Sequence, residues 1–302
     1  MAGSVTPDQG RPTLADYREL WALKLSKIKR PDFGRTKKDY EHFYQDYFQN
    51  EDQTQYYRDQ RMAIRRDTVN ALLAKYLPEG GRLLDCGCGL GDVLSGIKGP
   101  YELFGFDFSQ NNVDRTSKRL AGKATIKQGS IYEIPYETGS MDGAICTQVL
   151  EHIEDDGRAV ADIARCLKPG AFFITSVPYN YYFPVYERLI GHFRHYTRES
   201  FKALLAGAGF EIVEYYHNHP NWHRAYVSGY TWVRAKHMLF GRLVGSKSIY
   251  DFKWPWSAKP SIEKLNERLK PLLERDETLD YSRLSTSTNV VARKVKRPGA
   301  AP

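Results

Sequence analysis

Short apolar segments recur between residues 80 and 216, separated by stretches in which apolar positions follow a helical period. Six of these segments predict β-strands: Arg82–Cys86, Leu103–Asp107, Ala124–Gln128, Gly143–Thr147, Phe172–Val177 and Phe210–Tyr215. Two of the stretches between them, Asp155–Leu167 and Arg198–Ala208, predict helices. Strands that alternate with helices in this way are typical of βαβ units. The pattern therefore predicts an α/β fold with a doubly wound, mostly parallel sheet.

The flanking residues carry other patterns. Helices are expected over Leu14–Ile28 and over Gln60–Leu77, the second ending before Pro78. A seventh strand is expected at Thr288–Val295, about 70 residues after the sixth, and that gap is too long for a bare loop in a compact domain. We therefore expect a helical insertion before the last strand. The predicted units are an N-terminal helical arm and lid (1–78), an α/β core (79–216), the insertion (217–286) and the last strand with its tail (287–302).

Composition narrows the class of protein. With 41% hydrophobic and 26% charged residues, the 302-residue chain is neither disordered nor fibrous. It has no apolar run of about 18 residues, so no membrane span is expected. The first residues lack an apolar signal segment, and four cysteines make a poor disulfide framework, so a cytoplasmic location is expected. A net charge of +8 with 13% aromatic residues favours nucleic acid, an anionic substrate or a membrane surface as partner.

The most informative motif is a glycine-rich turn. The predicted strand Arg82–Cys86 runs into Gly87-x-Gly89-x-Gly91 and then into Asp92. Glycines at such a turn let the backbone approach a ligand closely, and amides at the start of a helix face what binds there. A tight strand-to-helix turn is the structural alternative. The motif departs from the dinucleotide fingerprint G-x-G-x-x-G, because its third glycine comes one position early.

An acid ends the next predicted strand. Asp107 is expected at the carboxyl edge of the sheet, beside the glycine turn, where ligands bind in doubly wound folds. A carboxylate at this place suits hydrogen bonds to two ribose hydroxyls. An adenosine ligand without a pyrophosphate fits both the acid and the glycine spacing, whereas NAD or NADP would need the later glycine.

Several motifs together resemble those of the class I S-adenosylmethionine-dependent methyltransferases, especially small-molecule enzymes of the ubiquinone-biosynthesis type. In chain order they are Asp85–Gly91 (DCGCGLG), Phe106–Ser109 (FDFS), Gln128–Ile131 (QGSI), Ala144–His152 (AICTQVLEH) and Leu167–Gly170 (LKPG). The resemblance covers about residues 80–216 and the last strand. It implies a Rossmann-like, seven-stranded sheet and S-adenosyl-L-methionine as cofactor.

The resemblance also assigns residues to the cofactor. They are Asp85, Gly87, Cys88, Gly89, Gly91, Asp107, Phe108, Ser130, Ile131 and Gln148. Ser130 stands where the family often has an aspartate that holds the adenine amino group. Adenine contacts are therefore expected from backbone amides, the Ser130 hydroxyl and the apolar wall of Phe108 and Ile131.

Methyl transfer from a sulfonium requires alignment and exclusion of water, and a base only if the acceptor keeps its proton through the attack. His152, after the fourth strand, and His192, in Gly191–Thr197 (GHFRHYT), are the candidate bases; packing or capping is the alternative for each. Acceptor contacts are expected from Tyr179, Tyr182, Arg194, His195 and Trp222. Thr197 is expected to cap the following helix. The Cys86/Cys88 pair is interpreted as packing in a crowded turn, and no metal site is predicted.

The insertion carries most of the unusual composition. Residues 217–260 contain seven basic residues against one acid, and four of the five Trp. We expect this segment to cap the acceptor, with contact to anionic lipid, a dimer surface or a solubilising appendage as alternatives. Nucleic acid is not expected, because no RNA-binding motif is present. The sequence thus predicts a methyltransferase that transfers a methyl group to O, N or C of a small, anionic or lipid-like molecule. RNA or protein methylation and a non-catalytic cofactor-binding subunit are the alternatives, and the oligomeric state is open.

Overall fold

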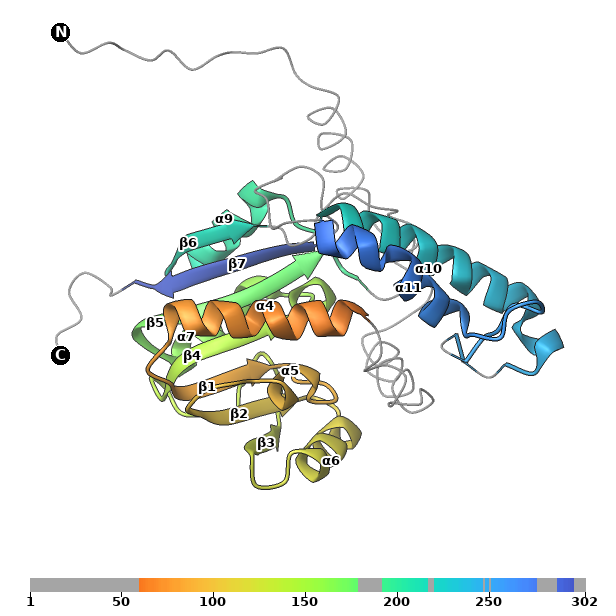
Figure 1. Cartoon of the computed structure of the whole chain (residues 1–302). Coiled ribbons are helices and arrows are strands. Elements are labelled where there is room, and N and C mark those ends of the chain that lie inside the picture. The colour runs from red at the N-terminus through yellow and green to blue at the C-terminus, as the bar shows by residue number, and fades with distance from the viewer. Residues whose placement is uncertain are drawn as a thin grey trace, which may run out of the picture.

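The computed structural model describes residues 60–178, 192–216, 220–246, 248–249, 251–275 and 287–295. Within these residues seven strands form one sheet in the order β3-β2-β1-β4-β5-β7-β6 (Figure 1). They are β1 (Gly81–Cys86), β2 (Tyr101–Asp107), β3 (Ala124–Gln128), β4 (Met141–Thr147), β5 (Leu167–Pro178), β6 (Phe210–Tyr216) and β7 (Ser287–Lys294). All seven predicted strands are confirmed. The largest difference is at β5, which begins five residues early because Leu167 already pairs with Met141.

The direction of the strands fixes where a ligand can bind. The pairs that join β1 to β2 and β4, β2 to β3, and β4 to β5 are parallel. Strand β7 is antiparallel to both of its neighbours, β5 and β6. The predicted mostly parallel sheet is therefore confirmed. The first six strands all end at one edge, here called the carboxyl edge, and the insertion between β6 and β7 leaves and returns at that edge.

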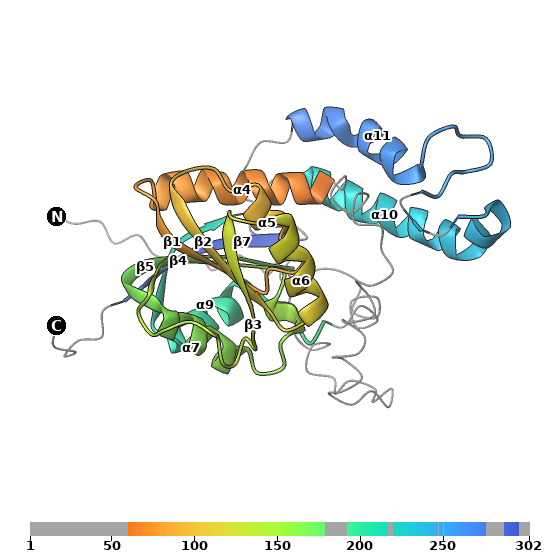
Figure 2. The ribbon, with the colours of Figure 1, turned by 90° about the horizontal axis from the view of Figure 1, so that it is seen from below.

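Helices cover both faces of the sheet (Figure 2). One face carries α4 (Gln60–Tyr76), α5 (Asp92–Ser95) and α6 (Gln110–Arg119), and the other carries α7 (Asp156–Cys166) and α9 (Arg198–Gly207). Successive side chains of a strand point to opposite faces. Leu83 accordingly packs with Val69 and Leu73 of α4, whereas Leu84 belongs to the cluster that contains Val160 of α7. The predicted helix Leu14–Ile28 and most of the predicted lid lie outside the described residues.

The predicted helical insertion is a hairpin of α10 (Pro220–Phe240) and α11 (Ser261–Arg275), with a short 3-10 helix, η2 (Gly241–Val244), after α10. Both figures show the two helices side by side, extending past the carboxyl edge on the side of α4 (Figures 1 and 2). At the base of the hairpin, Trp222 belongs to a hydrophobic cluster that includes Ile64 of α4. The Arg61 guanidinium lies 4.5 Å from the centre of the Tyr230 ring. None of the described helices combines the length and the apolar character needed to cross a membrane.

Candidate active site

The glycine turn between β1 and α5 has a left-handed backbone. Gly87, Gly89 and Gly91 have φ angles of 73°, 52° and 71°, a region that favours glycine. A Cβ at Gly87 would lie 2.9 Å from the Val149 side chain, which follows β4, so close packing also requires this glycine. A Cβ at Gly89 would meet nothing within 4 Å. The tight-turn interpretation therefore accounts for Gly87, while Gly89 faces open space that a ligand can approach.

The backbone amides of this turn bond to the protein itself. The N–H groups of Gly87 and Cys88 donate to the Phe106 carbonyl at 3.0 and 2.9 Å, and that of Gly89 donates to Asp107 Oδ2 at 2.9 Å. The expectation that the amides face a ligand is wrong for these three, because their hydrogen bonds join the turn to β2. A phosphate, which needs free amide donors, would find few of them here.

Asp107 is held firmly at the carboxyl end of β2. Its Oδ1 accepts hydrogen bonds from Ser109 N at 3.0 Å and from Asn112 Nδ2 at 3.1 Å. Burial raises the pKa of Asp107, and these hydrogen bonds, with the one from Gly89, oppose that rise. Sequence reasoning missed Asn112, whose position five residues after the acid becomes meaningful only once α6 is in place. The carboxylate is thus fixed at the edge where the sequence predicted it.

Two more buried acids stand near the glycine turn. Burial, with the charge of Asp107, raises the pKa of Asp85 to about 7. Burial also raises the pKa of Asp92, which pairs with Arg66 of α4 at 2.5 Å. Buried carboxylates of this kind attract a cation and repel a phosphate. This charge distribution fits a sulfonium and an ammonium group better than it fits a dinucleotide.

The residues expected around adenine differ in exposure. Phe108 has an exposed ring, and Ser130 is exposed, with its Oγ accepting a hydrogen bond from Tyr132 N at 3.2 Å. Ile131 is buried in the core, so of the predicted apolar wall Phe108 presents the open surface. Cys88 packs with Leu94 beneath the turn, and burial raises the pKa of its thiol, as expected for a packing cysteine.

Gln148 is strained at the carboxyl end of β4. Its φ is 57°, and among the described residues it alone combines a left-handed backbone with a side chain larger than that of glycine. Its N–H donates to the Ser176 carbonyl at 2.8 Å, and its side-chain amide donates to Ser176 Oγ at 3.4 Å. Backbone strain of this kind costs of order 1–3 kcal/mol and concentrates at functional sites. The position therefore supports a functional role for the end of β4.

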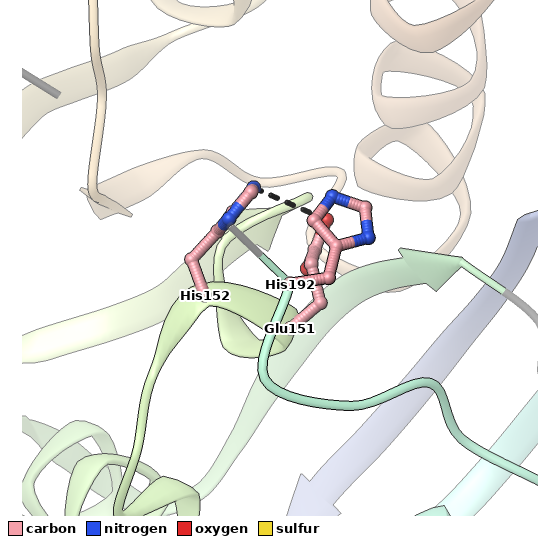
Figure 3. A group of neighbouring side chains, drawn as sticks. All are labelled: Glu151, His152 and His192. Atoms are coloured by element: carbon pink, nitrogen blue, oxygen red, sulfur yellow. Dashed lines mark ion pairs between the residues drawn. The ribbon is translucent and has the colours of Figure 1, made fainter. Parts of the chain in front are cut away.

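Just beyond Gln148, an acid and two histidines come together (Figure 3). Glu151 and His152 lie on a 3-10 turn, η1 (Leu150–His152), and His192 comes from the segment before α9. Their ligand atoms all lie within 4.8 Å of one another, and His152 Nε2 is 3.9 Å from Glu151 Oε1. His192 Nδ1 in turn lies 2.8 Å from His195 Nε2. The predicted pair of histidines is thus brought together, with His195 beside it.

Glu151 is a second residue that sequence reasoning missed. Its side chain is 1% exposed. Its carbonyl accepts a hydrogen bond from Phe193 N at 2.6 Å. This bond joins η1 to residues 192–196, here called the histidine segment. A buried carboxylate beside imidazoles can stabilise an imidazolium, and the same groups are ligands for divalent metals. Although no metal was predicted, the cluster has the donor types for one.

The other residues predicted to contact the acceptor do not join the cluster of Glu151, His152 and His192 in the described residues. Arg194 forms an ion pair with Asp156 and donates to the Glu154 carbonyl, so its guanidinium fastens the histidine segment to α7. Trp222 is 0% exposed and stacks on Tyr226 at the base of the hairpin. These placements argue against acceptor contacts for Arg194 and Trp222. Tyr179 and Tyr182 lie outside the described residues.

Thr197 confirms its predicted capping role. Its Oγ1 accepts a hydrogen bond from Ser200 N at 3.1 Å, and Ser200 Oγ accepts one from Thr197 N at 2.9 Å. This capping box starts α9 immediately after the histidine segment. The cap and the Arg194 pair together fix the segment that carries His192 and His195.

Comparison with known proteins decides the family. The sequence model of a family described as "Methyltransferase domain" matches residues 55–215. This chain belongs to the class I S-adenosylmethionine-dependent methyltransferases. The methyltransferase is 29% identical over 141 residues to a probable S-adenosylmethionine-dependent methyltransferase of Mycolicibacterium smegmatis, covering 45% of this chain and 54% of the relative. It is 28% identical over 134 residues to a demethylmenaquinone methyltransferase of Staphylococcus aureus, covering 42% and 56%.

Solved structures support the fold of this methyltransferase. A crystal structure of a proposed sarcosine dimethylglycine methyltransferase from Galdieria sulphuraria superposes with a TM-score of 0.54 at 16% identity, covering 77% of this chain and 86% of that one. Identity at this level shows the fold alone. The chain spans about half the length of the two curated relatives named above.

Proposed function

We propose that this methyltransferase transfers a methyl group from S-adenosyl-L-methionine to an O or N atom of a small, anionic or lipid-like molecule. The observation that carries the proposal is the cluster of Glu151, His152 and His192 at the carboxyl edge. The cluster follows directly on the Val149 side chain that packs against the glycine turn. A base therefore stands beside the place where the cofactor's methyl group is expected.

The residues at the carboxyl edge match the charge and shape of the cofactor. Asp107 would accept hydrogen bonds from the ribose hydroxyls, and the exposed ring of Phe108 would cover the adenine. Asp85 would face the cationic part of the molecule, which compensates the cost of ionising a buried carboxyl. Bound S-adenosyl-L-methionine supplies an electrophilic methyl carbon on sulfur and leaves as S-adenosylhomocysteine.

The histidines have a defined task in this proposal. An imidazole nitrogen of His152 or His192 takes the proton from the acceptor atom, so that its lone pair is free to form the new bond to carbon. Glu151 stabilises the imidazolium that results. His195, 2.8 Å from His192, positions that ring. An acceptor carbon has less need of such a base, which is why O and N are favoured.

The same cluster supports a second role. Its ligand atoms lie within 4.8 Å of one another, close enough for one divalent ion to bridge them. An ion there would orient acceptor oxygens and lower their pKa, in place of direct proton transfer to histidine. The acid–base cluster and the strained Gln148 are both hard to account for in a subunit that only binds cofactor.

The test uses the full chain with methyl-labelled cofactor and a cell extract fractionated into small molecules, lipids, RNA and protein. We expect label in the small-molecule or lipid fraction. His152→Asn and His192→Asn should lower transfer by about 10²–10⁴-fold without a change in cofactor affinity. Glu102→Gln, an exposed residue of β2 away from the cluster, is the control.

Three outcomes distinguish the alternatives. Transfer at the wild-type rate by both histidine variants would contradict the role of the cluster. Label in the RNA or protein fraction would replace the acceptor class. Loss of transfer on treatment with a chelator, with recovery on adding Mg²⁺, Mn²⁺ or Zn²⁺, would assign the cluster to a metal rather than to proton transfer.

A further inference from the structure

The far end of the α10–α11 hairpin, residues 231–258, is here called the hairpin tip. Seven of the ten exposed large apolar residues in the described part of the chain lie in it. The five most exposed are Trp232 (68%), Met238 (77%), Leu239 (71%), Leu243 (81%) and Trp256 (78%). Scattered apolar residues are normal on a surface, but a cluster of this kind marks a surface that contacts something else.

The hairpin tip is a packed unit that holds these side chains in place. Phe252 is fully buried, and its ring lies 6.2 Å from the ring of Trp254. Trp254 also contacts Phe240 at 5.6 Å and Trp256 at 5.2 Å between ring centres. The exposed apolar side chains therefore project from a small aromatic core. They are presented to solvent by a built structure.

Charge in the hairpin tip is strongly one-sided. The sequence 231–258 contains five basic residues and one acid, Asp251. That acid accepts hydrogen bonds from Ser246 Oγ at 2.7 Å and Ser248 N at 2.9 Å, so local donors satisfy it. The Lys236 ammonium lies 4.8 Å from the centre of the Trp254 ring and 5.8 Å from that of Trp232. Exposed apolar groups are thus accompanied by positive charge.

We propose that the hairpin tip docks on a membrane surface that contains anionic lipid. Leu and Met side chains enter the boundary of the acyl chains, Trp rings settle at the level of the headgroups, and Lys and Arg pair with anionic headgroups. The hairpin extends past the carboxyl edge, which lets its end reach a flat surface (Figures 1 and 2). The proposal does not depend on the identity of the acceptor.

Other occupants fit less well. In a symmetric pair of chains, the same basic patch would face its own copy, which costs electrostatic energy. A nucleic acid would satisfy the charges and stack on the Trp rings. It offers nothing, however, to the aliphatic side chains of Met238, Leu239 and Leu243, which are among the most exposed in the hairpin tip.

Docking would place the site near the lipid. Because α10 begins directly after β6 at the carboxyl edge, a membrane held by the hairpin tip lies on the side of the sheet where the glycine turn and the histidine cluster stand. An apolar acceptor dissolved in the bilayer would then be concentrated close to the site. A water-soluble acceptor would gain nothing from this arrangement.

The experiment is flotation of the full chain with vesicles of phosphatidylcholine alone or mixed with phosphatidylglycerol. We expect binding to the mixed vesicles only, weakening as salt is added. The double variant Met238→Glu/Leu243→Glu should lower the partition coefficient by about tenfold or more. Lys236→Glu/Arg242→Glu should lower it by a similar factor. Val213→Glu changes an apolar residue on β6 that is 45% exposed and is the control outside the hairpin tip.

A second measurement separates folding from docking. Each variant should retain the wild-type unfolding midpoint and cofactor affinity, because Met238, Leu243 and Arg242 are exposed, Lys236 is half-buried, and all four lie away from the glycine turn. Absence of binding by the wild-type chain to mixed vesicles would overturn the proposal. Binding that the tip variants leave unchanged would also overturn it. Sedimentation that shows a dimer abolished by the same variants would make the hairpin tip a contact between copies.

Discussion

The carboxyl edge and the hairpin tip are opposite exceptions to the same rule. Folded proteins normally bury apolar groups and expose charged ones. At the edge, the carboxyls of Asp85 and Asp107 are buried, whereas at the tip Leu243 and Trp256 are exposed. Neither arrangement favours folding, because buried charges lose their hydration and exposed apolar groups remain in contact with water. These two arrangements are the observations behind our two proposals, a cationic ligand at the edge and an anionic lipid surface at the tip.

The base of the hairpin shows that this contrast is local. Trp222 and Tyr226 lie within the same helix as exposed Trp232, yet both are fully buried in a cluster that includes Ile64 of α4. The aromatic residues of α10 thus form two groups along the helix, one buried at its start and one exposed toward its end. Its first turns join the hairpin to α4, and its end presents side chains to the outside.

The largest expected effect tests this division. Trp222→Ala should lower the free energy of unfolding by about 3–5 kcal/mol, because it leaves a cavity at the base of the hairpin. Trp222→Phe keeps an aromatic ring and should cost much less. Denaturant unfolding measures both. Unchanged stability together with a raised KM for the acceptor would return Trp222 to the acceptor pocket.

The next effect concerns the edge. Asp107→Ala should weaken cofactor binding by about 100-fold, because it removes charged hydrogen bonds to two ribose hydroxyls. Calorimetric titration with S-adenosylhomocysteine measures it. Glu102→Ala, on the exposed part of the same strand, is the control. Asp107→Asn keeps the shape of the side chain and separates ribose binding from support of the glycine turn. Unchanged affinity in both variants would contradict the ribose assignment.

The effect that is smallest per pH unit is a pH dependence at Asp85. Its pKa is about 7 in the folded protein against an ordinary value of 3.8, so between these pH values the folded chain holds the extra proton. Stability should therefore fall as pH rises through this window, while affinity for a cationic ligand should rise by up to about tenfold per pH unit. Asp85→Asn should flatten both curves. The exposed Asp67→Asn serves as control, and a wild-type pH profile in Asp85→Asn would sink the assignment.

The fold was predictable because local pattern and tertiary structure agree. Runs such as Leu83–Cys86 are buried on both faces, as strands covered by two helical layers must be, and the glycine turn ends β1 where the sequence indicates. The order of β6 and β7 was not predictable from pattern. It depends on which edge of the sheet each strand joins, and side-chain alternation carries no such information.

A site residue was predictable only where its type and its position in the fold together allow a single role. Asp107 after β2 is such a case. Arg194 is not, because a guanidinium serves an acceptor or a carboxylate equally well, and only the fold brings Asp156 within reach. Glu151 was missed for the same reason, since nothing local distinguishes a buried acid from one that starts a helix. The placement of both depends on contacts between segments about 40 residues apart.

The reversed direction of β7 has a consequence for how this protein can change. Tyr216 at the end of β6 pairs with Asn289 near the start of β7, so the two ends of the insertion lie side by side. A turn of a few residues can join two antiparallel strands. Segments of any length can therefore be exchanged at this point while every strand keeps its partner. The antiparallel pairing of β7 therefore lets the insertion between β6 and β7 change in length and sequence without moving the strands that carry the glycine turn and Asp107.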